Sequence, residues 1–188
     1  REQQNYLIRV KYGKLTDNLT NGINISVPEA TGAIAFYKKS HLIIKVKSRN
    51  GYLTFMMGKI LINEKGTAGR FDTLWTFYVK NTTGFSRGQD IYYDAQTDCL
   101  FIPQCNNANN VNKIMVVNLS GESETYKGNK LYTPQDIITV DKQKDYSKYE
   151  IESLVIAPKR HIVMVANIVP KGTKTADDAV ERISNLKF

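Results

Sequence analysis

The sequence contains few of the side chains that usually mark a metal or catalytic site. Its 188 residues include only two cysteines, two histidines and one tryptophan. No His or Cys pair has the spacing of a structural zinc site, so neither a metal nor a cofactor is expected. Nucleophile-elbow, Walker and dinucleotide-binding motifs are also absent. A Ser–His–Asp triad is disfavoured because His41 and His161 are the only histidines.

The two cysteines, Cys99 and Cys105, are six positions apart in an apolar stretch. In an extended strand this spacing separates them by about 20 Å, which is too far for a disulfide. We therefore expect two buried thiols that act as small hydrophobic side chains.

Long hydrophobic runs and lysine clusters are lacking as well. No run approaches the roughly 18 apolar residues of a membrane-spanning helix, so no membrane span is expected. The net charge is +8, but the lysines are scattered along the chain. Such scattered charge favours solubility, and nucleic acid is not the expected partner. The chain begins at Arg1 rather than Met, which suggests a processed product or a piece of a longer protein.

Short apolar segments separated by Gly, Asn, Asp, Ser and Lys turns make up most of the chain. Their richness in Ile, Val, Tyr and Phe predicts an all-β fold. The expected strands are 6–11, 33–37, 42–47, 52–57, 59–62, 74–79, 89–93, 99–102, 113–119, 137–140, 151–157 and 162–168. After Thr175, the residues Val180, Ile183 and Leu186 recur at helical spacing, so a short C-terminal helix is predicted over 175–186.

Three stretches share a pattern of two apolar strands joined by a polar bend. They read GAIAFYKKSHLIIKV, GQDIYYDAQTDCLFIP and EIESLVIAPKRHIVMVA. Ile34, Ile91 and Leu154 take equivalent positions, so the repeat distances are 57 residues (34 to 91) and 63 residues (91 to 154). Flanking strands complete a four-strand set around the middle stretch, comprising 72–80, 89–93, 99–102 and 113–119.

Four antiparallel strands repeated at this spacing resemble the blades of a β-propeller. The resemblance covers about residues 30–169 and implies a single propeller-like domain over 1–188. Because a closed propeller needs at least four blades and about three are visible, strand exchange with the N-terminal strand, a missing segment or a second copy of the chain is expected to complete it. The alternative fold is a β-sandwich. The segment YEIESLVIAPKRHIVMVANI also resembles part of the helveticin-type bacteriocins.

Polar side chains stand at the entrances of the repeated strands. Arg87, Gln89 and Asp90 open the middle repeat, and Glu150 and Glu152 take a comparable place in the third. In a propeller such strands converge on the central channel, so these side chains are expected at a shared mouth. Alternatively, the carboxylates satisfy turn amides or pair with Arg87 and nearby lysines.

The single tryptophan is the other candidate. Alternation along its strand places Trp75 and Phe77 on one face, where a surplus aromatic ring offers a stacking platform for a sugar or a base. The predicted ligand-binding residues are Arg87, Gln89, Asp90, Glu152 and Trp75.

These residues predict a binding or interaction module that recognises a carbohydrate or a protein at a cell surface. A secreted or cell-surface location is expected, with a cytoplasmic one left open. The alternative is a glycoside-active enzyme, a hydrolase or lyase, that uses Asp90 with Glu150 or Glu152 as paired carboxylates. A third hypothesis is an anionic-polymer binder with steep salt dependence.

Overall fold

A computed structural model describes residues 6–9, 23–27, 31–38, 40–49, 51–85, 88–106, 111–141, 145–157 and 161–183. Every regular element within these ranges is a β-strand, which confirms the all-β prediction. The strands are β1 (Tyr6–Arg9), β2 (Ile23–Ser26), β3 (Thr31–Tyr37), β4 (His41–Arg49), β5 (Tyr52–Ile62), β6 (Ala68–Lys80), β7 (Tyr92–Asp94), β8 (Cys99–Asn106), β9 (Val111–Asn118), β10 (Glu124–Tyr126), β11 (Asn129–Tyr132), β12 (Asp136–Val140), β13 (Tyr146–Ala157), β14 (His161–Pro170) and β15 (Asp177–Ile183).

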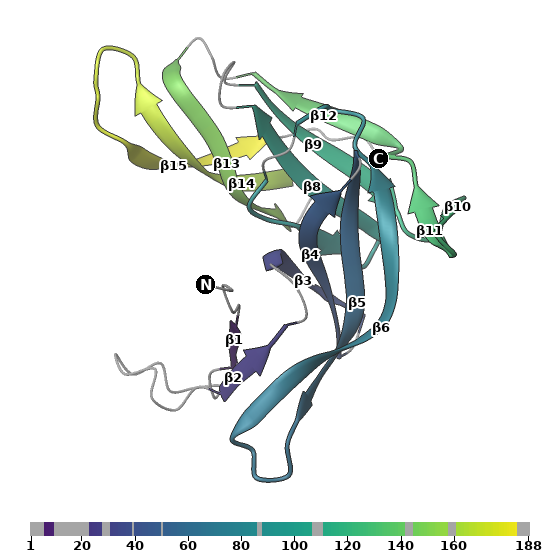
Figure 1. The fold of residues 1–188 in the computed structure, drawn as a ribbon. Helices are drawn as coiled ribbons and strands as arrows, with labels where there is room; N and C mark the ends of the chain where they lie inside the picture. The colour runs from purple at the N-terminus through teal and green to yellow at the C-terminus, as the bar shows by residue number, and fades with distance from the viewer. Residues whose placement is uncertain are drawn as a thin grey trace.

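The strands form three sheets (Figure 1). The first sheet has the order β1-β2-β6-β5-β4-β3, and the β10–β11 hairpin joins it where β11 pairs with β6. The second sheet has the order β12-β9-β8-β7, and the third has the order β13-β14-β15. Among these pairings only β2 and β11 run parallel to their neighbour, and that neighbour is β6 in both cases.

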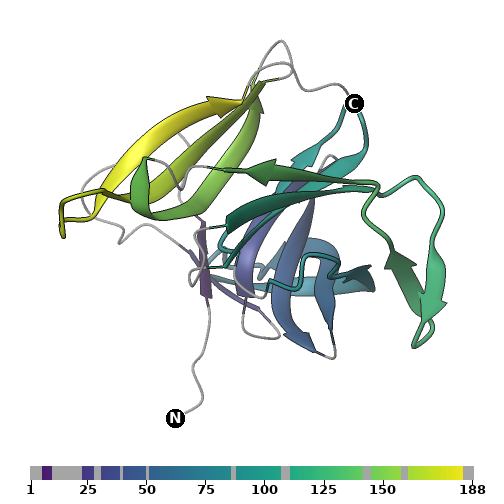
Figure 2. The ribbon, with the colours of Figure 1, turned by 90° about the horizontal axis from the view of Figure 1, so that it is seen from above.

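The second sheet is the middle layer of the molecule (Figure 2). Leu100 and Ile102 of β8 pack in a core cluster with the first sheet, whereas Phe101 packs in a different cluster with the third sheet. Both faces of β8 are therefore covered, and almost all of its side chains are buried. The third sheet is covered on one face, and β14 alternates between buried and half-buried side chains. Packing of sheet upon sheet is the arrangement of the sandwich alternative, here with three layers.

The three predicted hairpins are present, but the four-strand set built around the middle one is wrong. β3–β4, β7–β8 and β13–β14 each pair antiparallel. However, the sheets hold eight, four and three strands, and β6 pairs with β5 in the first sheet instead of standing beside β7. Consecutive strands usually pair locally, and the long β5–β6 hairpin follows that rule. The blade-like repeat is therefore not shown, and β1 pairs with β2 rather than with the third hairpin.

The predicted C-terminal helix is also wrong in its described part. Asp177–Ile183 is strand β15, which pairs with β14 in the third sheet. Val180 is 77% exposed, whereas Ala179 and Ile183 pack against the core cluster of that sheet. A helix of about 12 residues is marginal on its own, and the β14 edge offers backbone hydrogen bonds that compete with it. Pairing along the sheet edge therefore overrides the helical spacing.

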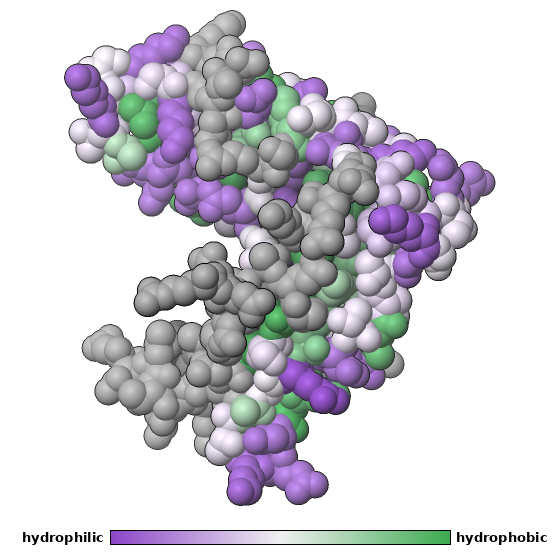
Figure 3. All heavy atoms as spheres, in the orientation of Figure 1, coloured by the Kyte–Doolittle hydropathy of each residue, from purple (hydrophilic) through white to green (hydrophobic). Residues whose placement is uncertain are grey.

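Cys99 and Cys105 are buried in β8 and form no disulfide, as predicted. Hydrophilic side chains gather over the outer end of the third sheet and over the β5–β6 turn (Figure 3). No helix in the described ranges is long and apolar enough to cross a membrane.

Candidate functional site

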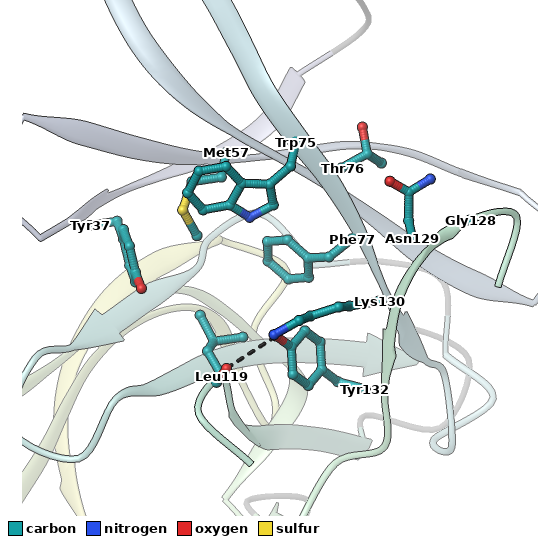
Figure 4. A pocket seen from close by; sticks show the side chains of 10 residues that line it. All are labelled: Tyr37, Met57, Trp75, Thr76, Phe77, Leu119, Gly128, Asn129, Lys130 and Tyr132. Carbon is teal, nitrogen blue, oxygen red and sulfur yellow. Dashed lines mark hydrogen bonds between the residues drawn. The ribbon is translucent and has the colours of Figure 1, made fainter. Parts of the chain in front are cut away.

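A cavity of about 370 Å³ lies between strands of the first sheet, the β10–β11 hairpin and Leu119, which follows β9. We call it the Trp75 cavity, and Figure 4 shows its side chains. Its lining consists of Tyr37, Met57, Trp75, Thr76, Phe77, Leu119, Gly128, Asn129, Lys130 and Tyr132. Four of these ten residues are aromatic, and the polar residues Thr76, Asn129 and Lys130 also belong to the lining.

The floor of the cavity follows from alternation along β6. Trp75 and Phe77 project to the same side of the strand, as predicted (Figure 4). Phe77 is 2% exposed and stacks on Phe55 of β5 with ring centroids 5.1 Å apart. Trp75 lies outside the core cluster that contains Phe77 and is 45% exposed. One aromatic ring therefore serves the core, and the next faces solvent.

A bulge and an uncovered edge make Trp75 accessible. Met57 pairs with Trp75 and Gly58 with Thr73, so Leu74 is the extra residue on β6. On the edge away from β5, β2 pairs with residues 68–70 and β11 with residues 77–79. Within the part of the chain that the structure describes, no strand pairs with residues 71–76 on that edge. Trp75 lies in this gap.

The opposite wall comes from β11. Lys127 and Gly128 both have positive φ angles, 51° and 73°, which is the geometry of the tight type I′ turn that joins β10 to β11. Tyr132 lies on the cavity side of β11, and its ring meets Phe77 edge-on at 5.7 Å. Its hydroxyl donates a hydrogen bond of 3.1 Å to the Leu119 carbonyl, which fastens β11 to the end of β9. This wall is therefore held in place by both packing and hydrogen bonding.

A polar network supports the third wall, at Tyr37. The ring of Tyr37 lies 4.6 Å from that of Tyr93. The Tyr93 hydroxyl donates to Asp98 at 2.5 Å, and the Lys38 ammonium lies 3.0 Å from the same carboxylate. Burial acts to raise the pKa of Asp98, but hydrogen bonds from Tyr93, Lys38 and Ser120 outweigh it and lower that pKa. Burial and the neighbouring Asp98 in turn raise the pKa of Tyr93.

The other predicted site residues lie elsewhere, where the three sheets meet. Gln89 donates a hydrogen bond of 3.3 Å to Glu150, which brings the polar entrances of the middle and third hairpins together. The predicted channel mouth is not shown. Asp90 accepts a hydrogen bond of 2.9 Å from the Leu154 backbone N–H. Glu152 is half-buried in β13 at a β-bulge. Arg87 lies outside the described residues.

We define the junction cluster as Lys45, Gln89, Asp90, Gln104, Cys105, Asn112 and Glu150. Asn112 is 0% exposed and bridges the second and third sheets. Its amide donates to the Tyr149 carbonyl at 2.8 Å and accepts from the Ile151 N–H at 3.1 Å. Lys45 donates to the Gly88 carbonyl at 2.9 Å, and burial lowers the pKa of Lys45 to about 8.

The carboxylates of the junction cluster are occupied by structural partners. Glu150 receives hydrogen bonds from Gln89 and from the Cys105 thiol, and its other oxygen lies 3.6 Å from the Lys148 ammonium. Burial raises the pKa of Asp90, and hydrogen bonds from the Leu154 and Ile91 backbones partly offset that rise. Neither Asp90, Glu150 nor Glu152 lines the Trp75 cavity or the second cavity at the β5–β6 hairpin.

Sequence reasoning identified Trp75 but missed the residues opposite it, namely Tyr37, Asn129, Lys130 and Tyr132. Tyr-Lys-Gly-Asn at 126–129 is a recognisable hairpin turn, but the parallel pairing of β11 with β6 joins segments about 50 residues apart and leaves no local signal. Among the residues that the structure describes, no group of three or more His, Cys, Asp or Glu side chains is placed to hold a metal ion.

No family model, no curated protein and no solved structure matches this chain. The resemblances to β-propellers and to helveticin-type bacteriocins therefore stay predictions, and the functional argument rests on the geometry of the Trp75 cavity.

Proposed function

We propose that this protein is a binding module that recognises a carbohydrate in the Trp75 cavity, at a cell surface or as a secreted protein. The observation that carries the proposal is a half-exposed indole ring facing a cavity whose other walls are also aromatic. The C–H face of a sugar ring stacks on such a surface, while its hydroxyl groups need polar partners nearby.

The lining also contains polar groups that can bind the hydroxyl groups of a stacked sugar. Thr76, Asn129 and Lys130 lie among the aromatic residues and offer a hydroxyl, an amide and an ammonium group. The volume of about 370 Å³ falls in the range of small-ligand pockets. A short segment or an end of a glycan is the ligand that suits this size.

A protein ligand is the second candidate, because the edge of β6 at residues 71–76 is unpaired within the described chain. An extended peptide could add a strand there, since exposed strand edges are sites of β-strand addition. The bulge at Leu74 interrupts the regular pairing that this mode requires, and we therefore rank it below carbohydrate.

The enzyme alternative has less support, because the carboxylates of the junction cluster already bind protein groups. Asp90→Asn and Glu152→Gln, made separately, distinguish the two functions. A glycoside-active enzyme should lose turnover by orders of magnitude in one of these variants. A binder that uses the Trp75 cavity should keep its affinity for glycan in both.

The single tryptophan makes the proposal directly testable. A glycan array identifies candidate ligands, and titration of each ligand should change the emission of Trp75. By calorimetry, Trp75→Ala should bind at least about tenfold more weakly, which corresponds to about 1.4 kcal/mol. The matched control is Phe36→Ala, which removes an exposed aromatic ring of the same sheet that lies outside the cavity lining. Equal affinities of wild type and Trp75→Ala would overturn the proposal.

A further inference from the structure

We infer that the Trp75 cavity selects an acidic sugar, a uronate whose carboxylate binds Lys130. This inference rests on the proposed function, because it names the class of carbohydrate that the same cavity takes. Three features of the cavity carry it: the sign of its charge, the position of Lys130 and the balance of its hydrogen-bonding groups.

The lining carries one charged side chain, Lys130, and no Asp or Glu. Ionised carboxylates are strong hydrogen-bond acceptors, and a cavity without them has no charged acceptor for the hydroxyl groups of a neutral sugar. A cationic cavity instead favours a ligand with its own negative charge. The net charge of +8 adds a long-range attraction of the same sign.

Lys130 is positioned for this role. Its Nζ lies 5.9 Å from the centroid of the Tyr132 ring, and Figure 4 shows the side chain extended along the cavity wall toward Leu119. Lys38 pairs with Asp98 and Lys80 pairs with Glu124, whereas Lys130 makes no ion pair with any carboxylate in the described ranges. Its charge is therefore available to a ligand.

The neighbouring groups also favour an acceptor-rich ligand. The Lys130 ammonium supplies N–H donors to the cavity, whereas the neighbouring Asn129 amide already donates one N–H to the Lys127 carbonyl at 3.0 Å. The hydroxyl proton of Tyr132 is committed to the Leu119 carbonyl. A carboxylate offers two oxygens with about four lone-pair sites, and it can accept from more than one N–H of the Lys130 ammonium. The sugar ring would then lie on Trp75.

The test uses matched pairs of probes: methyl glucuronide, galacturonide and mannuronide, each with the neutral glycoside of the same ring. Binding is followed by Trp75 emission and by calorimetry. We expect at least one uronide to bind about tenfold more tightly than its neutral partner. Lys130→Gln should abolish this preference, so that each uronide binds no more tightly than its neutral partner, while Lys130→Arg should restore the preference. Lys171→Gln, which removes an exposed charge from the turn after β14, is the matched control.

Each outcome decides the inference. Equal binding of acidic and neutral sugars would overturn it and leave the proposed function standing. A uronide preference that persists in Lys130→Gln would also overturn it, since a group other than Lys130 would then bind the carboxylate. If no sugar binds and the Trp75 emission stays constant, the proposed function itself fails. Thermal unfolding of each variant confirms that a loss of binding does not come from a loss of fold.

Discussion

At the junction cluster, the buried side chains of Asn112 and Lys45 bind backbone groups of neighbouring segments, whereas at the Trp75 cavity the indole ring of Trp75 faces solvent. Asn112 makes two hydrogen bonds to the third sheet and is fully buried. Trp75 lies beyond the core of the same all-β chain and leaves nearly half of its surface exposed. The junction cluster places polar side chains in the interior, and the Trp75 cavity places an aromatic ring at the surface.

The difference shows that a polar residue at a strand entrance is not by itself a site. Buried polar groups are tolerated when they are hydrogen-bonded, as Asn112 and Lys45 are, although Oε1 of Gln104 in the same cluster has no hydrogen-bond partner among the described residues. The exposed ring of Trp75 makes no such bonds between layers of the described chain, which is why we propose a ligand there. Variants in each region should therefore affect different measurements: stability at the junction and binding at the cavity.

The largest effect on stability is expected for Asn112→Leu. This change leaves the Tyr149 carbonyl and the Ile151 N–H buried without their partner, at about 1–3 kcal/mol for each group. We expect the free energy of unfolding, measured by urea denaturation, to fall by about 4 kcal/mol. The matched control is Asn118→Leu at the end of the same strand, where the amide binds only the exposed Ser120 turn. Similar losses in both variants would contradict a special role for Asn112.

Lys45→Met should change the pH dependence of stability. Burial lowers the pKa of Lys45 from 10.5 to about 8, so its contribution is fully present above pH 10.5 and is lost as the pH falls through about 8. At about 1.4 kcal/mol per pKa unit, the contribution of Lys45 to the free energy of unfolding changes by about 3 kcal/mol over this pH range. Between about pH 10 and pH 7, wild type should therefore lose stability relative to Lys45→Met.

Urea unfolding at several pH values between about 7 and about 10 measures the difference in the free energy of unfolding between wild type and Lys45→Met. Lys59→Met, at an exposed position of the same sheet, is the control and should follow wild type. A constant difference between wild type and Lys45→Met across the range would show that burial does not perturb Lys45. The junction would then be more open to water than the geometry indicates.

Local features of the fold were predictable from sequence, and the way the sheets are assembled was not. Polar bends between apolar runs located the three repeated hairpins, because a hairpin depends on a turn and its flanking residues. The sheet that β6 joins depends instead on packing between distant segments. The same limit explains β15, where the edge of β14 outcompeted a helical spacing that was only local.

The candidate site, like the fold, was predictable only in its local features. Alternation correctly placed Trp75 and Phe77 on one face of the strand, and the repeat pointed to the strand entrances where Gln89 and Glu150 meet without predicting that contact. Neither argument could reveal that Lys130 and Tyr132 face Trp75, because they reach it through the parallel pairing of β11 with β6. Sequence could also not distinguish a carboxylate that binds a ligand from one that binds the backbone of another sheet.

A smaller effect is expected at the rim of the cavity, for Asp98→Asn. The Lys38–Asp98 pair is partly exposed, so its loss should lower the free energy of unfolding by only about 1 kcal/mol at neutral pH. Because the pKa of Asp98 is lowered, its contribution is present above its ordinary value of 3.8 and is lost as the pH falls through the folded value.

Thermal unfolding at about pH 7 and about pH 3 tests this prediction. The difference in melting temperature between wild type and Asp98→Asn should narrow in acid. Glu122→Gln, which removes an exposed carboxylate, is the control. If the difference in melting temperature widens in acid, the hydrogen bonds from Tyr93 and Lys38 do not stabilise the ionised Asp98 carboxylate. Another interaction must then hold Tyr37 in place.

The smallest effect on stability is expected for Trp75→Phe, and it separates the cavity most clearly from the core. A phenyl ring keeps the contact with Met57, the cross-strand partner of Trp75, and the lost part of the indole belongs to a half-exposed side chain. We expect the free energy of unfolding to change by about 0.5 kcal/mol, as for surface substitutions. Phe77 lies two residues along the same face, and its ring packs between Phe55 and Tyr132. Phe77→Leu should therefore lower the free energy of unfolding by about 1–2 kcal/mol. Circular dichroism during urea unfolding compares the two variants without a tryptophan signal. A larger loss for Trp75→Phe than for Phe77→Leu would mean that folding itself requires the indole, and the exposed ring would then no longer be evidence for a ligand.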